Sequence, residues 1–199
     1  MNRIKRLFDL SICTFFIIPL LFLILFLSLF LLVFQGRSIF FLQRRVGLKG
    51  KIFNIIKFRT MKINSEDSHG KNITLNNDPR ITKIGKFYRK YKLDEFPAIY
   101  NVIKGDMSLV GPRPDVVGYA DRLHGDSKKI LEVRPGITGP ASLKYANEES
   151  LFSHVDDFKK YNDEVIFPDK VKLNIKYIEN WSMLDDIKII FKTIFRRTY

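Results

Sequence analysis

Hydrophobic residues are distributed unevenly along the chain, and one apolar block near the N-terminus dominates the pattern. The segment Leu10–Phe34 contains 25 residues without a charged side chain. About 20 apolar residues are enough for a helix to cross the hydrocarbon core of a bilayer. A signal peptide fits less well, because its apolar core has only about 7–15 residues and ends at a small-residue cleavage site. The block therefore predicts a membrane helix.

Two features bear on how this block meets the membrane. Pro19 lies inside it, and proline kinks or breaks a helix because it lacks a backbone donor and clashes with the preceding turn. Basic side chains flank both ends, which favours placing both ends on the cytoplasmic side. The flanking residues are Arg3, Lys5 and Arg6 before the block and Arg37, Arg44, Arg45, Lys49 and Lys51 after it. On these residues alone, a helix–break–helix hairpin in one leaflet and a bent single span both stay open.

The rest of the chain alternates short strand patterns with amphipathic helix patterns. Residues 38–46 and 51–61 are rich in β-branched and aromatic side chains, and the glycine-containing turn between them predicts a β-hairpin. Residues 62–79 are polar and end in a turn signal, which predicts a loop. Apolar residues at helical spacing predict helices beyond this loop. These helices are expected over 81–91, from Pro97 to Gly105, and over 115–132, 169–180 and 184–197.

Charge and cysteine content narrow the function classes. The chain has 34 Lys and Arg against 21 Asp and Glu, a net charge of +13. This excess indicates an anionic partner: a nucleic acid, a membrane surface or a phosphorylated substrate. The single cysteine, Cys13, excludes an intrachain disulfide framework and a multi-cysteine metal site. The basic segment 184–197 fits a helix in the membrane interface and a core helix with a solvated face equally well.

An acidic pair in basic surroundings is the main candidate for chemistry. Asp94 and Glu95 lie between a basic cluster that begins at Arg89 and a proline-rich turn that contains Arg113. A carboxylate at a helix N-terminus close to arginines is expected to have a depressed pKa, so it stays ionised and can serve as a nucleophile or metal ligand. Arginines can hold phosphate oxygens through paired hydrogen bonds. Helix capping and surface ion pairs explain the same residues without catalysis, and this interpretation stays open.

The order of short motifs along almost the whole chain resembles the bacterial sugar transferase family, the monotopic polyprenyl-phosphate phosphoglycosyl transferases. The most specific stretch, from Leu93 to Pro114, contains the acidic pair. The length is similar to that of the minimal catalytic members of this family. The matching segments are 5–9, 43–47, 57–61, 78–82, 93–97, 101–114, 134–139 and 186–190.

The resemblance implies a two-step transfer. Asp94 attacks the β-phosphorus of a UDP-sugar, UMP leaves, and the resulting phosphosugar–aspartyl intermediate is attacked by polyprenyl phosphate. Glu95 is the partner carboxylate, and Mg²⁺ is expected at Asp94 and Glu95, since family members need it and two anionic phosphates must approach a carboxylate. Arg89 and Arg113 match family positions and are assigned to phosphate binding. Further candidates for phosphate binding are Arg134, Lys57 and Arg59.

The resemblance also implies a re-entrant helix that breaks at Pro19. The expected fold is α+β and helix-dominated, with a re-entrant helix–break–helix over residues 1–36 and a cytosolic and interfacial catalytic domain over residues 37–199. A small β-hairpin and interfacial amphipathic helices belong to that domain. The chain departs from the family at Ile18, where Ser is common, and after residue 139, where Lys144 is the one candidate for an expected basic residue.

We therefore expect a transferase that begins glycan assembly at the bacterial inner membrane, with its catalytic part facing the cytoplasm. The expected donor is a UDP-N-acetyl-amino-hexose, and the acceptor is polyprenyl (undecaprenyl) phosphate. A UDP-hexose donor with the same chemistry and a non-catalytic scaffold that binds anionic lipid are the alternatives. Membrane lipid and downstream glycosyltransferases are the expected partners. Nucleic acid is not expected, because the chain has no recognisable binding motif for it.

Overall fold

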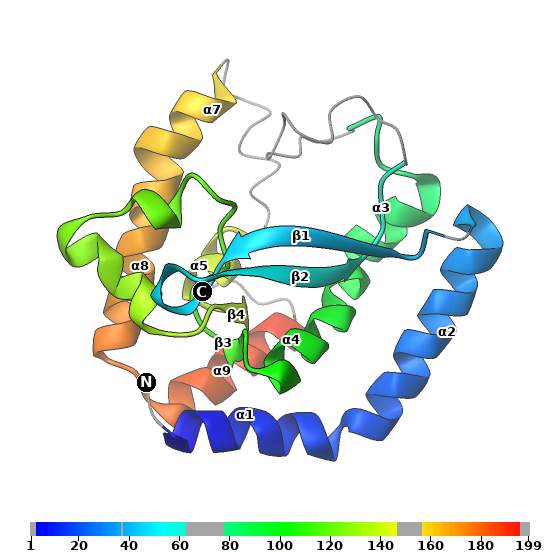
Figure 1. Ribbon diagram of the computed structural model, residues 1–199, viewed down its shortest axis with the longest axis horizontal. Helices are drawn as coiled ribbons and strands as arrows, with labels where there is room; N and C mark the ends of the chain where they lie inside the picture. Colours follow the sequence, from blue (N-terminus) through cyan, green and yellow to red (C-terminus); the bar gives the residue numbers. More distant parts are fainter. Residues whose placement is uncertain (1–2, 37, 63–77, 147–156, 196–199) are drawn as a thin grey trace.

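The structure, a computed structural model, describes residues 3–36, 38–62, 78–146 and 157–195. This part of the chain is helix-dominated α+β, as predicted, with two small two-stranded sheets at its centre (Figure 1). The α-helices are α1 (Arg3–Phe15), α2 (Ile17–Gln35), α3 (Lys83–Lys90), α4 (Ile99–Lys104), α5 (Pro140–Lys144), α7 (Phe158–Tyr161), α8 (Phe167–Glu179) and α9 (Met183–Ile194). The strands are β1 (Phe40–Val46), β2 (Ile52–Phe58), β3 (Ser108–Val110) and β4 (Gly136–Thr138).

The apolar block bends where α1 meets α2. The bend centres on Phe16, whose φ of −96° and ψ of 6° lie outside the helical region. Pro19 follows in the first turn of α2. Because proline has no N–H, the carbonyl of Phe15 loses its helical partner and the chain turns one turn before the proline. The break predicted at Pro19 is thus present, but it lies three residues earlier in the chain.

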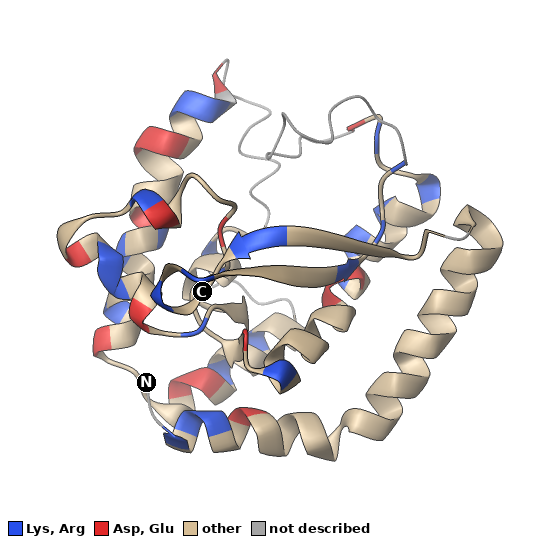
Figure 2. Ribbon diagram, viewed as in Figure 1, with Lys and Arg blue, Asp and Glu red and all other residues tan. Residues whose placement is uncertain are grey.

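Helix α2 carries most of the apolar residues of the block, and most of their side chains are exposed on the surface of the protein. Within the described ranges it is the one helix that is long and apolar enough to cross a membrane, by length and composition. Figure 2 shows no charged residue along it. The Ser28 hydroxyl donates to the Ile24 carbonyl one turn earlier in the helix at 2.7 Å. Fully buried Tyr88 donates its hydroxyl to the Leu27 carbonyl at 2.8 Å and ties α2 to α3.

Helix α1 differs from α2 because its inner face is polar and buried. Lys5 Nζ donates to Asp186 on α9, and the Tyr177 hydroxyl donates to the same carboxylate at 2.5 Å. Asp9 accepts a hydrogen bond from the Ser108 hydroxyl of β3 at 2.8 Å. These contacts attach α1 to the C-terminal helix and to one central sheet. The sequence pattern did not indicate this buried network.

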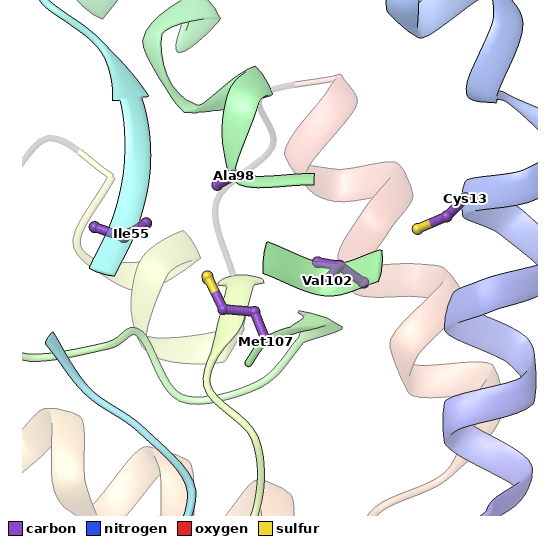
Figure 3. Close-up of a cluster of buried hydrophobic side chains, with 5 residues drawn as sticks. All are labelled: Cys13, Ile55, Ala98, Val102 and Met107. Atoms are coloured by element: carbon purple, nitrogen blue, oxygen red, sulfur yellow. The ribbon is translucent and has the colours of Figure 1, made fainter. Parts of the chain in front are cut away.

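The predicted β-hairpin is confirmed as β1 and β2, which pair antiparallel with the tight turn at Leu48–Gly50 between them. Phe41 pairs with Lys57 and Arg45 pairs with Phe53. Because directly opposed side chains share a face of the sheet, Arg45 and Lys57 lie on the same face. Figure 3 shows Ile55 of that face close to Ala98, Val102 and Met107, which belong to one buried apolar cluster that also includes Cys13.

The predicted helix over 115–132 is wrong. Two 3₁₀ helices, η3 (Ala120–Arg122) and η4 (Gly125–Glu132), occupy this stretch. Gly118 and Gly125 have φ values of +105° and +56°. This left-handed backbone interrupts an α-helix at both points. Most of the predicted loop over 62–79 and the end of the predicted helix over 184–197 lie outside the described residues.

Candidate active site

The acidic pair lies on a 3₁₀ helix, η2 (Leu93–Ala98), and not at the start of an α-helix as predicted. Lys92, with a left-handed φ of 56°, begins this turn, and α4 follows at Ile99. A 3₁₀ helix has three residues per turn, so neighbouring side chains diverge by about 120°. Asp94 and Glu95 consequently point into different surroundings.

Glu95 is held by two cations through a single oxygen. Lys57 Nζ lies 2.9 Å from Glu95 Oε1, and Arg113 Nη2 lies 2.6 Å from the same oxygen. Burial acts to raise the pKa of Glu95, but the charges of Arg113 and Lys57 outweigh it and hold the pKa well below its usual range. Glu95 is therefore ionised and fixed in place.

Asp94 has the opposite environment. Its side chain is buried, and Oδ1 has no hydrogen-bond partner among the described residues. Burial and the charge of Glu95 raise the pKa of Asp94, while Lys57 and Arg89 offset this only in part. The prediction of a depressed pKa is thus wrong for Asp94, because the 3₁₀ turn directs Glu95, and not Asp94, onto the cations. The result is a buried carboxylate with an uncommitted oxygen.

A small pocket adjoins Glu95, and Arg45 contributes to it although we did not predict Arg45 as a site residue. Arg45, Lys57, Glu95 and Arg113 are the charged residues that line the pocket. Arg45 was not predicted because the pairing register of β1 and β2 determines which side chains of β1 lie beside Lys57, and the sequence does not give that register. The signal was available in the 43–47 motif, where Arg44 and Arg45 point to opposite faces of a strand.

Three glycines fix the turn that carries Arg113. A Cβ atom at Gly136 would lie 2.1 Å from the Gly111 nitrogen, and one at Gly139 would lie 2.2 Å from the Gly111 carbonyl oxygen. No other residue allows this approach of backbone to backbone. The Gly136 N–H donates to the Pro112 carbonyl at 2.8 Å and closes the contact. The parallel pair β3–β4 thereby holds Arg113 against Glu95.

Arg89 reaches the site from α3. A Cβ at Gly85 would lie 2.1 Å from the Thr60 carbonyl oxygen, so glycine lets α3 lie directly on the chain that leaves β2. The Arg89 charge is one of those that lower the pKa of Asp94. Lys57 and Arg113 thus contact the acidic pair, whereas Arg89 acts on Asp94 through its charge.

The remaining predicted residues make other contacts. Arg59 lies over the Phe41 ring at 5.5 Å and donates to the Phe40 carbonyl at 3.3 Å. Arg134 donates from Nε to the Gly105 carbonyl at 2.7 Å. Lys144 pairs with Asp169 at 2.8 Å. None of these three basic residues lines the pocket beside Glu95.

The acidic pair fits a magnesium ion in part. Asp94 Oδ1 is buried without a partner among the described residues, and both cations on Glu95 contact the same oxygen, Oε1. Within the described part of the chain, no group of three His, Cys, Asp or Glu residues could hold a metal ion. Mg²⁺ sites often use one or two carboxylates and complete their shell with water and substrate phosphates. Asp94 and Glu95 are the residues that match this pattern.

Comparison with known proteins decides the family. Residues 1–198 match the profile described as bacterial sugar transferase. The chain belongs to this family. The galactosyl transferase CpsE of Streptococcus agalactiae is 41% identical over 170 residues, which cover 80% of this chain and 34% of that protein.

Two further relatives differ in length. The undecaprenyl-phosphate galactose phosphotransferase of Salmonella typhimurium is 37% identical over 165 residues, covering 76% of this chain and 31% of that protein. The uncharacterized sugar transferase EpsL of Bacillus subtilis is 36% identical over 191 residues, covering 96% of this chain and 85% of that protein. This sugar transferase chain spans about a third of the length of the longer relatives that it matches.

Proposed function

We propose that this bacterial sugar transferase moves a hexose 1-phosphate from a UDP-hexose to undecaprenyl phosphate and releases UMP. The observation that carries the proposal is the unlike pair of carboxylates. Glu95 is ionised and fixed by Lys57 and Arg113, while Asp94 has a buried oxygen for which the described part of the chain offers no partner. A nucleophile needs a free oxygen, and phosphoryl transfer needs fixed cations around it.

The reaction proceeds in two displacements at one phosphorus. An Asp94 oxygen forms a bond to the β-phosphorus of the donor while the bond from that phosphorus to the bridging oxygen breaks, and UMP leaves with the electron pair. An oxygen of undecaprenyl phosphate then displaces the Asp94 carboxylate from the same phosphorus. Asp94 is regenerated, and no oxidation or reduction occurs.

The cationic residues oppose the repulsion between a carboxylate and two phosphates. Arg89 and Arg113 bind phosphate oxygens, and Lys57 keeps Glu95 oriented. Asp94 and Glu95 are the carboxylates that would hold Mg²⁺, which would supply charge neutralisation. Lys57 and Arg113 are already held in place by Glu95, which limits the reorganisation that the reaction requires.

A hexose donor is favoured over the amino-hexose donor expected from the sequence. The Salmonella relative is named a galactose phosphotransferase, and a Komagataeibacter xylinus relative, 34% identical, is named an undecaprenyl-phosphate glucose phosphotransferase. An Erwinia amylovora relative, 36% identical, is named a UDP-galactose-lipid carrier transferase. We carry the hexose donor and the undecaprenyl acceptor over from these names.

The chain is monotopic in our proposal, with both ends of the α1–α2 segment on the cytoplasmic side. Contacts at both ends support this. Lys5 of α1 bonds to Asp186, and Gln35 at the end of α2 donates to the Arg59 carbonyl at 2.9 Å. One globular body therefore binds both ends, which a straight crossing does not allow. The outer face of α9 carries exposed apolar residues, among them Leu184 and Phe191, and suits the membrane interface.

Labelling tests the topology. Single cysteines at positions 2 and 38, in a Cys13→Ser background, are expected to react with an impermeant maleimide only after the inner membrane is opened. Labelling of one position from the periplasm of intact spheroplasts contradicts the monotopic arrangement.

A panel of UDP-sugars tests the activity. The full chain in nanodiscs, with Mg²⁺ and undecaprenyl phosphate, is expected to release UMP from UDP-galactose or UDP-glucose. Asp94→Asn is expected to abolish release. Release from UDP-N-acetyl-amino-hexoses alone contradicts the hexose assignment, and absence of release from every donor favours the non-catalytic lipid-binding alternative.

A further inference from the structure

The pocket beside Glu95 contains more positive than negative charge. Lys57 and Arg113 both pair with Glu95. Arg45 lines the same pocket and forms no ion pair with any described carboxylate. The pocket is thus lined by three cations and one carboxylate. In the described part of the chain, Arg45 is the cation among them that has no carboxylate within ion-pair distance.

The Arg45 guanidinium is fixed by neutral acceptors. Nε and Nη2 donate to Gln43 Oε1 at 3.1 and 2.5 Å, and Nη1 donates to the Pro114 carbonyl at 3.0 Å. A guanidinium has five N–H groups, so one donor remains on each terminal nitrogen. Burial, and then the neighbouring charge of Arg113, lower the pKa of Arg45 to about 10, so it stays charged at neutral pH.

The hydrogen-bond partners of Arg45 are all neutral, and the carboxylates of Asp115 and Glu95 act on it only from beyond ion-pair distance. A bound anion therefore offsets part of the free energy that burying this cation costs. The group next to it, Arg113, is also a guanidinium, and its side chain is 40% exposed and accessible to a ligand. Two guanidinium groups in one pocket can hold the oxygens of a phosphate through several hydrogen bonds. Such an arrangement can bind a phosphate.

The identity of the phosphate follows from the divergence of the acidic pair. Asp94 does not line this pocket, whereas Glu95 does. A phosphate bound in this pocket is therefore assigned as one that Asp94 does not attack. In a nucleoside diphosphate donor, the other phosphate is the one that leaves with the nucleoside.

We propose that Arg45, together with Arg113, binds the departing phosphate of the donor, the group that leaves as UMP. This assignment rests on the proposed function for the identity of the donor. The two guanidinium groups stabilise the negative charge that develops on UMP as the bond to the β-phosphorus breaks. Binding of UMP itself does not depend on turnover and can be measured separately.

Arg45 could also act indirectly, because it ties β1 to the turn that carries Arg113. The Val46 N–H donates to the Asp115 carbonyl at 2.9 Å and makes a second tie that does not involve Arg45. Arg45→Lys separates the two roles, since lysine keeps the charge but not the paired contact with Gln43. If Arg45 binds phosphate directly, Arg45→Lys retains part of the affinity for UMP. If Arg45 acts only by tying β1 to the turn that carries Arg113, the lysine charge does not restore that affinity.

The experiment is calorimetric titration of the full chain in nanodiscs with UMP, and in parallel with uridine. Arg45→Gln is expected to weaken UMP binding about 10- to 100-fold, the effect of losing a charged hydrogen bond, and Arg45→Lys is expected to fall in between. Uridine binding is expected to stay unchanged, because uridine has no phosphate. Arg44→Gln is the matched control, since Arg44 is exposed and, as its neighbour on β1, points to the opposite face.

Three results overturn the proposal: unchanged UMP affinity in Arg45→Gln, an equal loss in Arg44→Gln, or an equal loss of uridine and UMP binding. If Arg45→Gln does not fold, UMP affinity in Arg45→Lys equal to that of the wild type overturns it instead. UMP binding that depends on Arg45 in a protein that turns over no UDP-sugar refutes the transferase but keeps the phosphate subsite. Turnover together with UMP binding that does not depend on Arg45 refutes the subsite alone.

Discussion

Neutralising Asp94 and neutralising Glu95 are expected to change the stability of the protein in opposite directions. The two residues are adjacent and carry the same charge, so the comparison isolates their surroundings. Glu95→Gln removes the partner of Lys57 and Arg113, whereas Asp94→Asn removes a buried charge whose Oδ1 has no described partner. Both variants are expected to lose transferase activity.

The magnitudes follow from exposure. The side chains of Lys57 and Glu95 are each 14% exposed, and that of Arg113 is 40% exposed. Breaking a buried ion pair costs about 3–5 kcal/mol, and solvent screening of Arg113 reduces this to about 2–3 kcal/mol for Glu95→Gln. A buried unpaired polar group costs about 1–3 kcal/mol. Asp94→Asn removes the buried charge but leaves an oxygen without a described partner, so only part of this cost is recovered. We therefore expect the free energy of unfolding to rise by about 1 kcal/mol.

Thermal unfolding in nanodiscs measures the difference. For a chain of this size, 1 kcal/mol corresponds to roughly 2–4 °C in Tm. We expect Asp94→Asn to unfold a few degrees above the wild type and Glu95→Gln to unfold several degrees below it. Shifts of the same sign refute the assignment of unlike environments to the two carboxylates.

The pH dependence gives a second check. The pKa of Glu95 is depressed in the folded protein, so its contribution is present above its unfolded pKa, about 4.3, and is lost as the pH falls through the folded value. The pKa of Asp94 is raised, so its ionisation costs stability at neutral pH. The advantage of Asp94→Asn therefore disappears as acid protonates Asp94 in the wild type. A constant advantage from neutral to acidic pH contradicts this reasoning.

Three further predictions concern the parts of the fold that position the site. Lys5→Met leaves Asp186 without its buried cation and is expected to cost about 3–5 kcal/mol, with faster hydrogen exchange in α1; unchanged α1 exchange refutes the anchoring role. Gly85→Ala places a methyl group against the Thr60 carbonyl and is expected to lower kcat/KM about 100-fold by displacing α3. The control Gly50→Ala has open space around the added methyl group and is expected to lose stability but not activity. Equal activities of the two variants argue against the role of Gly85 in positioning α3. Arg134→Ala is expected to cost about 1.5 kcal/mol of stability and leave UMP affinity unchanged, and weaker UMP binding returns Arg134 to the phosphate-binding residues.

The pattern of apolar residues and of turn-forming Pro and Gly predicted those elements that are placed by burying their own apolar side chains. The bend near Pro19, the hairpin and the helix that ends at Gly105 all appear close to their predicted places. Local patterns did not predict α1 as an anchored helix, because Lys5 was interpreted only as a basic flanking residue and Asp9 only as part of the matching segment 5–9. Their partners lie 181 and 99 residues away in the chain, so only the folded structure brings them together.

The structure brings some of the predicted site residues together, but their electrostatics differ from the prediction, and their catalytic roles stay predictions. The motif order identified Asp94, Glu95 and Arg113, which the structure brings together with Lys57. The expected depressed pKa belongs to Glu95 alone, because a 3₁₀ turn replaces the α-helical start that the proline indicated. Arg45 was predicted only as a basic flanking residue, because its place beside Lys57 depends on a strand register that a single sequence does not specify.

Covalent trapping at Asp94 tests the central claim most directly. The full chain is incubated with UDP-galactose or UDP-glucose and Mg²⁺ but without a lipid acceptor, quenched in acid and analysed by intact and peptide mass spectrometry. We expect one hexose phosphate on the peptide that contains Asp94, a matching burst of UMP, and no adduct in Asp94→Asn. Product that forms normally with an acceptor in Asp94→Asn, or an adduct on another residue, contradicts the account.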